Sequence, residues 1–491
     1  MKKALFLVAA ICSAIAFPCP MAAAETVSLT LADSIDMALF TDESIEGAEA
    51  GREAALHAWK AARRSKGPAV SWESQAVRIG GQDYESVKRA HSLYGDPHQE
   101  EVTVGSVLGV LPVYSTQTVG SYAYNNSFSN SLSLSVPLYT GGQLENRIKE
   151  GRYQLNKADL TVENTRQTVR YQVAEAYANL LHYENLAKVA KDAVDMGLTQ
   201  LDLIRAQFEE GAVAEADMLT MSVSIANYKQ NLVNAEKSVD VAKSTLASMV
   251  GLPQDTDVKP LDYFSYEPYD KELPECEEYA LAHRPDGLAA DYDIMAAKAQ
   301  KEAAKSGWRP RVTGVGTRSI AGNAPFGSER NSNWQAGVSV SWNIFDSGVT
   351  SENVRQADAM VNQYEALARK SRKKIRLETR TAWLSMKAAE QNIKETALAV
   401  EQAEDSYKIS QVRYEEGVDI IISVTNAQEK LTQARSNYMT ALYQYNLSRA
   451  NLEKAMGVPV GFDALAYVEA AGQGASADEA LTSSLLPEQS Q

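Results

Sequence analysis

One long segment of this chain occurs twice, at a constant spacing of 206 residues. Residues 138–253 align with residues 344–459 without a gap, and the turn glycine Gly211 falls on Gly417. An alignment of this length without a gap indicates a tandem duplication. Every structural element that the segment builds is therefore expected twice per chain.

Residues 1–24 are predicted to be an export signal. Lys2 and Lys3 form a positive start, an apolar run covers 4–17, and small alanines precede Glu25. This order of features is typical of a secretory signal peptide. The apolar run is too short to span a membrane well, so a transmembrane anchor is the weaker interpretation.

Composition excludes several classes of protein. The formal net charge is -15, and it becomes -17 without Lys2 and Lys3, which argues against nucleic-acid binding. After the signal, no apolar run reaches the ~18 residues of a spanning helix, so membrane insertion would require a β-barrel. Cys276 is the only cysteine after the signal. No intrachain disulfide, metal site or redox pair is predicted.

Both copies contain amphipathic strand patterns. Apolar residues alternate with serines up to Val136 in the first copy, and the pattern recurs over 334–344 in the second. Residues 102–144 include no Asp, Glu, Lys, Arg or His. Because aromatic residues also lie at the strand ends, as in the girdles of outer-membrane barrels, we predict β-hairpins at about 69–138 and about 311–345.

The first hairpin is predicted to be the longer one. Its opening strand matches the second copy at a spacing of 242, since Pro68 aligns with Pro310. The spacings 242 and 206 differ by 36 residues, which lie between about Trp72 and Tyr122. We interpret them as an enlarged external loop, the usual place for insertions.

A long helical hairpin follows each pair of strands. From Val169 to Phe208 the seam residues recur at alternating spacings of four and three, without a proline. We predict helical hairpins at about 142–250 and about 349–456, with helices of roughly 100 Å at ~1.5 Å per residue. Gly211 and Gly417 are predicted to end the outgoing helices.

The remaining divisions follow from these elements. The first repeat is placed at 25–253 and the second at 273–459, joined by a Pro-, Asp- and Tyr-rich linker at 254–272. The tail at 460–491 is rich in Ala, Gly and Ser, and we expect it to be partly disordered.

Four strands are too few to close a barrel, and open strand edges are not tolerated in lipid. The chain is therefore expected to oligomerise, and twelve strands from three chains are a natural closed solution. The helices would continue such a barrel as a hollow cylinder. The fold class is mainly α with a transmembrane β-barrel.

The chain resembles the TolC-like outer-membrane efflux proteins over nearly all of its mature length. The resemblance rests on the opening Leu29-Thr-Leu-Ala-Asp-Ser-Ile-Asp-Met-Ala-Leu39, the junction Val136-Pro-Leu-Tyr-Thr-Gly-Gly142 and the turn Arg413-Tyr414-Glu-Glu-Gly417, taken with the duplication. It implies a homotrimer with a 12-stranded barrel continued by a periplasmic α-helical tunnel.

The same resemblance implies location, partners and function. The protein would be an outer-membrane exit duct of a tripartite efflux pump or a type I secretion system. It would dock by its hairpin tips onto a periplasmic adaptor and an inner-membrane pump or ABC transporter. No catalytic activity, cofactor or metal is expected, because catalytic motifs and metal-ligand spacings are missing from the sequence.

The resemblance also marks residues at the hairpin tips. Adaptor docking is expected at Glu210, Gly211, Glu416 and Gly417. The candidate periplasmic gate comprises Asp217, Tyr414, Ser423 and Asn426.

The candidate gate departs from the family pattern. Ser423 and Asn426 occupy the family's acidic positions, six and nine residues after Gly417, so a divalent-cation-sensitive gate is not expected. Tyr414 matches a family tyrosine of the closed tip and equally fits a seam residue. For Asp217, a solvated charge or an acid at a helix N-terminus is a stronger interpretation than a gate role.

Two other interpretations stay open. The chain could be a periplasmic adaptor or an exported coiled-coil structural protein without a pore. The duplicated hairpin and the charge-free segment favour the duct over both. A simple porin is weaker still, because porins have short periplasmic turns.

Overall fold

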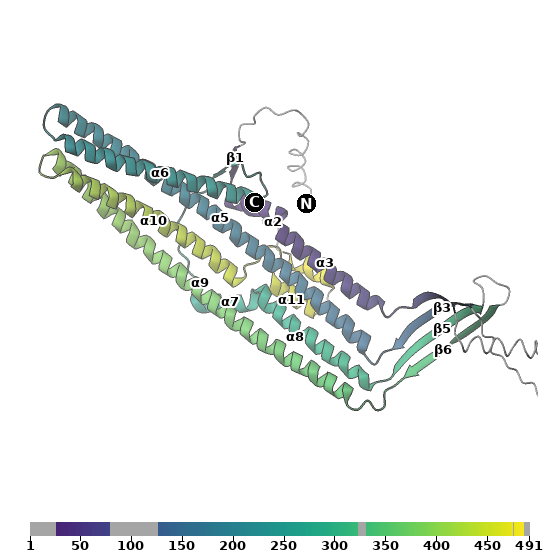
Figure 1. Cartoon of the computed structure of the whole chain (residues 1–491). Helices are drawn as coiled ribbons and strands as arrows, with labels where there is room; N and C mark the ends of the chain where they lie inside the picture. The colour runs from purple at the N-terminus through teal and green to yellow at the C-terminus, as the bar shows by residue number, and fades with distance from the viewer. Residues whose placement is uncertain (1–25, 79–125, 323–329, 475, 486–491) are drawn as a thin grey trace, which may run out of the picture. The chain divides into compact units, whose positions relative to one another are not determined.

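The computed structural model describes residues 26–78, 126–322, 330–474 and 476–485 (Figure 1). The predicted signal peptide and most of the predicted enlarged loop lie outside these ranges. The strands are β1 (Thr26–Leu29), β2 (Ala69–Arg78), β3 (Asn126–Tyr139), β4 (Asp257–Pro260), β5 (Arg311–Gly322) and β6 (Arg330–Ser341). The helices are α2 (Leu31–Thr41), α3 (Glu43–Arg64), α5 (Gln143–Glu209), α6 (Glu215–Met249), α7 (Leu273–His283), α8 (Pro285–Ala304), the 3-10 helix η1 (Lys305–Trp308), α9 (Val349–Glu415), α10 (Ile421–Met456), α11 (Ala464–Gly472) and α12 (Ala477–Ser484).

The described residues form two compact units. One draws on Met1–His57, Arg152–Ala296 and Val361–Gln491, and the other on Ala58–Gly151 and Ala297–Met360. Each unit contains parts of both repeats. The division of the chain at 25–253 and 273–459 therefore stays a prediction made from the sequence.

The smaller unit holds one antiparallel sheet, in the order β2-β3-β5-β6. The two hairpins join through β3 and β5, where Leu132 lies opposite Arg318. The alternation predicted for the second strand of each copy is present, because serines and apolar residues take opposite faces of β3. Tyr122 and Tyr124, which open the predicted strand, lie outside the described residues.

The larger unit holds most of the two helical hairpins, α5 with α6 and α9 with α10 (Figure 1), and the first turns of α5 and α9 belong to the smaller unit. Helices α5 and α9 each have 67 residues, or about 100 Å at 1.5 Å per residue, as predicted. The predicted seam is buried: Val169, Val173 and Leu180 are at most 2% exposed. They pack with Leu246 of α6 in one core cluster, and Met386 of α9 packs with Tyr445 of α10 in another.

The segment at 254–272, predicted to join the two repeats, contributes a strand to the fold. Its strand β4 pairs in parallel with β1, and Thr26 lies opposite Asp257. The carboxylate of Asp262 accepts hydrogen bonds from the backbone N–H of Leu31 at 2.7 Å and from the hydroxyl of Tyr177 at 2.9 Å. The linker therefore fastens the start of α2 to the long helix α5.

The tail expected to be partly disordered is folded over its described residues, 460–474 and 476–485. The tail folds into α11 and α12, and Phe462 and Tyr467 pack against Leu160 of α5. The carboxylate of Glu163, which is fully buried, accepts backbone N–H bonds from Val460 at 2.7 Å, Gly461 at 3.0 Å and Phe462 at 3.3 Å.

One turn away from Glu163, a second buried carboxylate holds the same tail. Asp159 is 1% exposed and accepts a hydrogen bond from the hydroxyl of Tyr467 at 2.6 Å, while Arg52 of α3 forms an ion pair with it. Buried carboxylates are tolerated where such donors satisfy them. From the sequence alone, Asp159 and Glu163 would be expected on the surface of a helix. In the structure both are buried and bind the tail.

Among the described residues, no helix is both long and apolar enough to cross a membrane.

We expect Glu163→Ala to release the tail. The change leaves three buried backbone N–H groups without their acceptor, at a cost of about 3 kcal/mol, which is a roughly hundredfold larger population of the detached tail. Limited proteolysis between residues 464 and 484 measures this population. Glu401→Ala, on an exposed position of α9, serves as the control and should leave the cleavage rate unchanged.

The same anchor predicts a dependence on pH. Burial raises the pKa of Glu163 above its ordinary value, against the opposing effect of the backbone N–H groups. An acid with a raised pKa stabilises the folded state most when protonated, and this contribution is lost as the pH rises through the folded-state pKa. As the pH rises through the folded-state pKa of Glu163, proteolytic cleavage of the tail should therefore become faster in the wild type. Cleavage of Glu163→Ala should not show this dependence on pH.

Candidate functional site: the tips of the two helical hairpins

The two hairpin tips have the same backbone geometry. Gly211 donates to the carbonyl of Phe208 at 2.9 Å, and Gly417 donates to the carbonyl of Tyr414 at 3.0 Å. Their φ angles are +74° and +71°, in the left-handed region that favours glycine, while a Cβ at either position would meet no atom within 4 Å. Backbone conformation, not crowding, therefore selects these glycines, as the sequence predicted.

The side chains of the two tips differ. Counted at the spacing of 206, Ala212, Ala214 and Ala216 of the first tip correspond to Val418, Ile420 and Ile422 of the second. All six are exposed, and the three larger residues are 68%, 62% and 51% exposed. Glu210 and Glu416 are also exposed, beside the turn glycines. The second tip thus presents more apolar surface than the first.

Asp419 organises the second tip. Its carboxylate accepts hydrogen bonds from the backbone N–H of Ile420 at 2.8 Å and from the hydroxyl of Ser423 at 2.7 Å, and Arg413 lies 3.4 Å away. The Ser423 hydroxyl, with that N–H and Arg413, lowers the pKa of Asp419. Asp419 therefore acts as the acid at the start of α10, where Ile420 has no capping side chain.

The candidate gate residues take different environments. Ser423 is half-buried and bonded to Asp419, whereas Asn426 is exposed. Asp217 is half-buried on α6, and its charge contributes to raising the pKa of Tyr414. The structure thus brings Asp217 and Tyr414 near each other, and it places Ser423 in a local cap. Their assignment to a gate stays a prediction.

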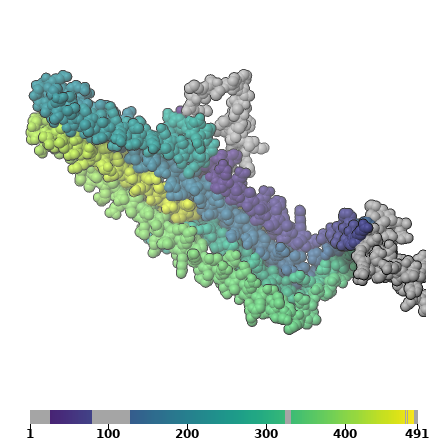
Figure 2. Space-filling model, viewed as in Figure 1, coloured from purple at the N-terminus to yellow at the C-terminus, as the bar shows by residue number. Residues whose placement is uncertain are grey.

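The two hairpins lie side by side toward their tips (Figure 2), and one apolar cluster there includes residues of both. Tyr414 of α9 is 5% exposed there, with Met221 of α6 and Ile421 of α10. Burial is the main cause of its raised pKa, and its hydroxyl has no hydrogen-bond partner among the described residues. This placement fits the interpretation of Tyr414 as a seam residue.

Close packing brings the helices of the first hairpin together at Gly197. A Cβ on Gly197 would meet Ile225 at 3.1 Å and Met221 at 3.2 Å. Across the hairpins, the side-chain amide of Gln428 on α10 donates to the carbonyl of Ala193 on α5 at 2.8 Å. Gln428 was not predicted from the sequence, although a glutamine among apolar seam residues indicates a buried polar contact.

No group of three or more His, Cys, Asp and Glu side chains in the described ranges is arranged to hold a metal ion.

Substitutions of Tyr414 test whether its hydroxyl holds the tip closed or whether the residue only packs in the helix seam. Tyr414→Phe removes a hydroxyl that bonds to nothing described, so we expect unchanged single-channel conductance and a change in stability of less than about 1 kcal/mol. Tyr414→Ala should cost about 3–4 kcal/mol through the cavity it leaves. Planar-bilayer recordings and thermal unfolding check both. A rise in conductance with Tyr414→Phe alone would instead show that the hydroxyl holds the tip closed.

Comparison with known proteins places the chain in a family. The sequence model of the outer membrane efflux protein family matches residues 34–252 and 278–458. The cobalt-zinc-cadmium resistance protein CzcC of Cupriavidus metallidurans is 23% identical over 71% of this chain and 82% of its own length. The outer membrane protein TolC of Escherichia coli is 25% identical over 67% of this chain and 70% of its own length.

Solved structures show the same fold. The crystal structure of the outer membrane protein VceC from Vibrio cholerae superposes with a TM-score of 0.69 at 18% identity, over 87% of this chain and 96% of that one. The matching family is one of outer membrane efflux proteins, and the adaptor interpretation is not favoured. The chain belongs to the outer membrane efflux protein family and is an outer-membrane export channel with a large periplasmic helical part.

Proposed function

We propose that three copies of this chain close into one duct, a 12-stranded barrel continued by a helical tunnel. The observation that carries this proposal is the open sheet of four strands. Its outer strands, β2 and β6, each pair on one side only within the described sheet. Backbone groups in lipid need partners, and the corresponding strands of neighbouring copies would supply them.

Exposed apolar stripes on the helices support the same assembly. On α6, Leu219, Val223, Val233 and Val241 are more than half exposed. At 3.6 residues per turn they fall within an arc of about 80°. On α9, the exposed residues Leu377, Leu384, Leu398, Ile409 and Val412 fall within an arc of about 100°. Such stripes are typical of helices that pack against a partner.

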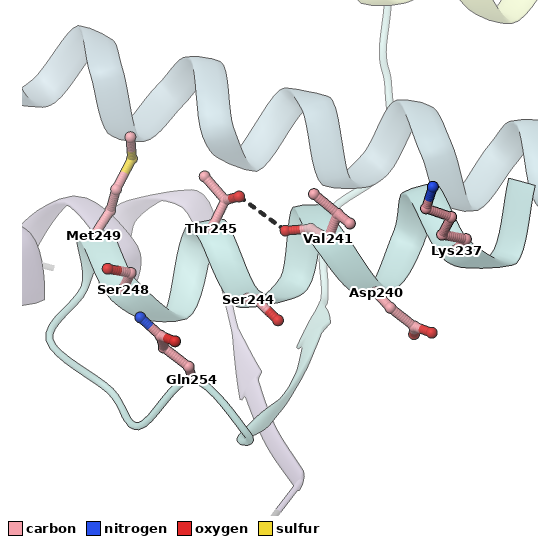
Figure 3. Close-up of a pocket in the computed structure, with 8 residues that line it drawn as sticks. All are labelled: Lys237, Asp240, Val241, Ser244, Thr245, Ser248, Met249 and Gln254. Atoms are coloured by element: carbon pink, nitrogen blue, oxygen red, sulfur yellow. Dashed lines mark hydrogen bonds between the residues drawn. The ribbon is translucent and has the colours of Figure 1, made fainter.

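A shallow groove runs along the same helix α6 (Figure 3). Val241 and Met249 contribute apolar surface to it, and Lys237 and Asp240 contribute opposite charges. It is further lined by Ser244, Thr245, Ser248 and Gln254. We propose that α9 of the neighbouring copy packs against this groove, because the exposed apolar stripe of α6 passes through it at Val241.

At the tips, we propose docking of a periplasmic adaptor that connects the duct to an inner-membrane pump or ABC transporter. Exposed Glu210 and Glu416 beside the turn glycines, and the apolar residues Val418 and Ile420, are accessible for such contact. Export would be passive, and the chain's own residues would shape and gate the conduit.

Cysteine cross-linking tests the assembly. Val233 lies 22 residues after Gly211, and Leu398 lies 19 residues before Gly417. In neighbouring copies the two residues would therefore lie at similar distances from the hairpin tips. Val233→Cys with Leu398→Cys should give covalently closed trimers under oxidation, since each copy links to both neighbours. Denaturing gels measure the products.

The matched control moves one cysteine along α9. Leu384 lies 14 residues from Leu398, about 21 Å along the helix, so Val233→Cys with Leu384→Cys should not link. Cys276 is buried and does not compete. Only dimers, or equal linking by both pairs, would contradict the closed ring.

Acidic substitutions test whether the candidate gate residues Ser423 and Asn426 line the narrowest point of the proposed duct. Asn426→Asp adds an exposed carboxylate per copy, and we expect the current to become sensitive to divalent cations. Ser423→Asp puts a second carboxylate against Asp419, so like-charge repulsion should loosen the tip and raise conductance, less so at acidic pH. Bilayer recordings measure both. If neither variant differed from wild type, these residues would not line the narrow point.

A further inference from the structure

One row of residues crosses all four strands of the sheet in register. Trp72 of β2 lies opposite Leu132 of β3, which lies opposite Arg318 of β5, which lies opposite Trp334 of β6. Residues opposite one another on adjacent strands share a face of the sheet. An arginine therefore stands between a leucine and a tryptophan on one face, with a second tryptophan one strand beyond the leucine.

This face is the apolar one. The rows between Arg318 and the start of the long helices contain Val70, Leu134, Val136, Val338 and Val340. The opposite face contains Ser71, Ser133, Thr317 and Gln335 in a single row. Trp72 and Trp334 are 70% and 79% exposed, and Arg318 is also exposed. In a membrane, the row of Arg318 would face lipid.

The row lies at one edge of the apolar band. Trp342, just after β6, marks the other edge, and its ring N–H donates to the carbonyl of Trp308 at 3.1 Å. Eight residues separate Trp334 from Trp342, or about 26 Å of strand, and a strand tilted by about 40° would cover about 20 Å of membrane. The next row outward contains Ser74, Asn130, Ile320 and Ser332 and is mainly polar.

The position of the row explains why an arginine is tolerated. A lipid-facing arginine costs about 2–4 kcal/mol at the bilayer midplane but only about 0–1 near the interface. The long helices α5 and α9 begin near the opposite ends of the strands. Since these helices are periplasmic, Arg318 would lie at the external leaflet.

Charge on this face has one sign. The strand positions on this face whose side chains are described include Arg78 and Arg318 and no Asp or Glu. Glu73 lies on the other face, opposite Ser131. Arg318 thus has no acid on its own face among the described strands, which leaves its charge available to an anion.

The duplication provides an internal comparison. Counted at the spacings of 242 and 206, the pair Arg318–Trp334 corresponds to Ala76–Phe128, which are also directly opposite each other. The aromatic residue occurs in both repeats, whereas the arginine occurs only in the second. A structural need of the hairpin would apply to both repeats, so the arginine points to a ligand.

We propose that Arg318, with Trp72 and Trp334 in the same row, binds a phosphate group of lipid A, the phosphorylated glycolipid of the external leaflet of outer membranes. A guanidinium binds phosphate through paired N–H donors, and tryptophans suit the boundary between acyl chains and headgroups. The proposal rests on the membrane placement given under Proposed function. It adds a lipid-binding site to the channel.

The experiment is native mass spectrometry of the purified protein with bisphosphorylated lipid A. We expect one bound lipid per copy and about tenfold weaker binding in Arg318→Gln, which keeps the length but loses the charge. Arg318→Lys should retain part of the affinity. Arg311→Gln is the matched control, because Arg311 lies on the other face at the inner end of β5 and should bind lipid A as wild type.

Binding of other lipids and channel recordings distinguish failure of the lipid site from failure of the proposed duct. Equal binding by Arg318→Gln would overturn the site, and equal binding of phosphatidylglycerol would show that any anionic lipid suffices. Arg318→Gln should keep wild-type conductance, which shows that it folds and inserts. If the wild type itself neither inserted nor conducted, the proposed duct would fail, which is a different result from a conducting channel without lipid selectivity.

Discussion

The unpaired edges of the four-stranded sheet are the constraint on which the rest of the architecture depends. Within the described sheet, β2 and β6 each pair on one side only, and both strands carry exposed apolar residues such as Trp72 and Trp334. Such edges are unstable in lipid and prone to aggregation in water. In the proposed trimer, pairing with further copies would satisfy the backbone groups of these edges, and lipid would cover the apolar face. Since α5 and α9 follow β3 and β6 along the chain, the sheet would also set the number and spacing of the helices around the proposed tunnel.

Inside one copy, buried polar groups set how the segments outside the repeats attach to the long helices. Asp262 ties the start of α2 to Tyr177, while Asp159 and Glu163 hold the tail on α5. Apolar packing alone is non-directional, whereas a carboxylate that binds three successive N–H groups accepts one register of the tail. The two short terminal regions are thus fixed at definite points of α5. The hairpin tips carry exposed side chains and stay available for partners.

Much of this fold could be predicted, because its signals are periodic. Seam residues such as Val173 and Leu180 repeat over many turns, and the alternation extends over most of β3 and β6. The tail and the linker escaped prediction because their structure comes from distant partners. Thr26 pairs with Asp257, and Tyr467 binds Asp159. Four-residue strands carry too little pattern to reveal such pairs. At the tips, the turn glycines were readable from φ preference alone. The bond between Ser423 and Asp419, four residues apart at a helix start, was readable too but was overlooked.

The two repeats have the same backbone conformation at equivalent positions but expose different side chains. Gly211 and Gly417 form the same turn, yet alanines surround one and valine and isoleucines the other. The hairpin pair Ala76–Phe128 likewise corresponds to Arg318–Trp334. Conformation is conserved between the copies because helix packing and strand pairing depend on it, whereas exposed positions are free to change. Such exposed positions are also where the proposed contacts with an adaptor and with lipid would form. By this reasoning the second repeat carries the more specialised surface, at its tip and at the outer edge of its strands.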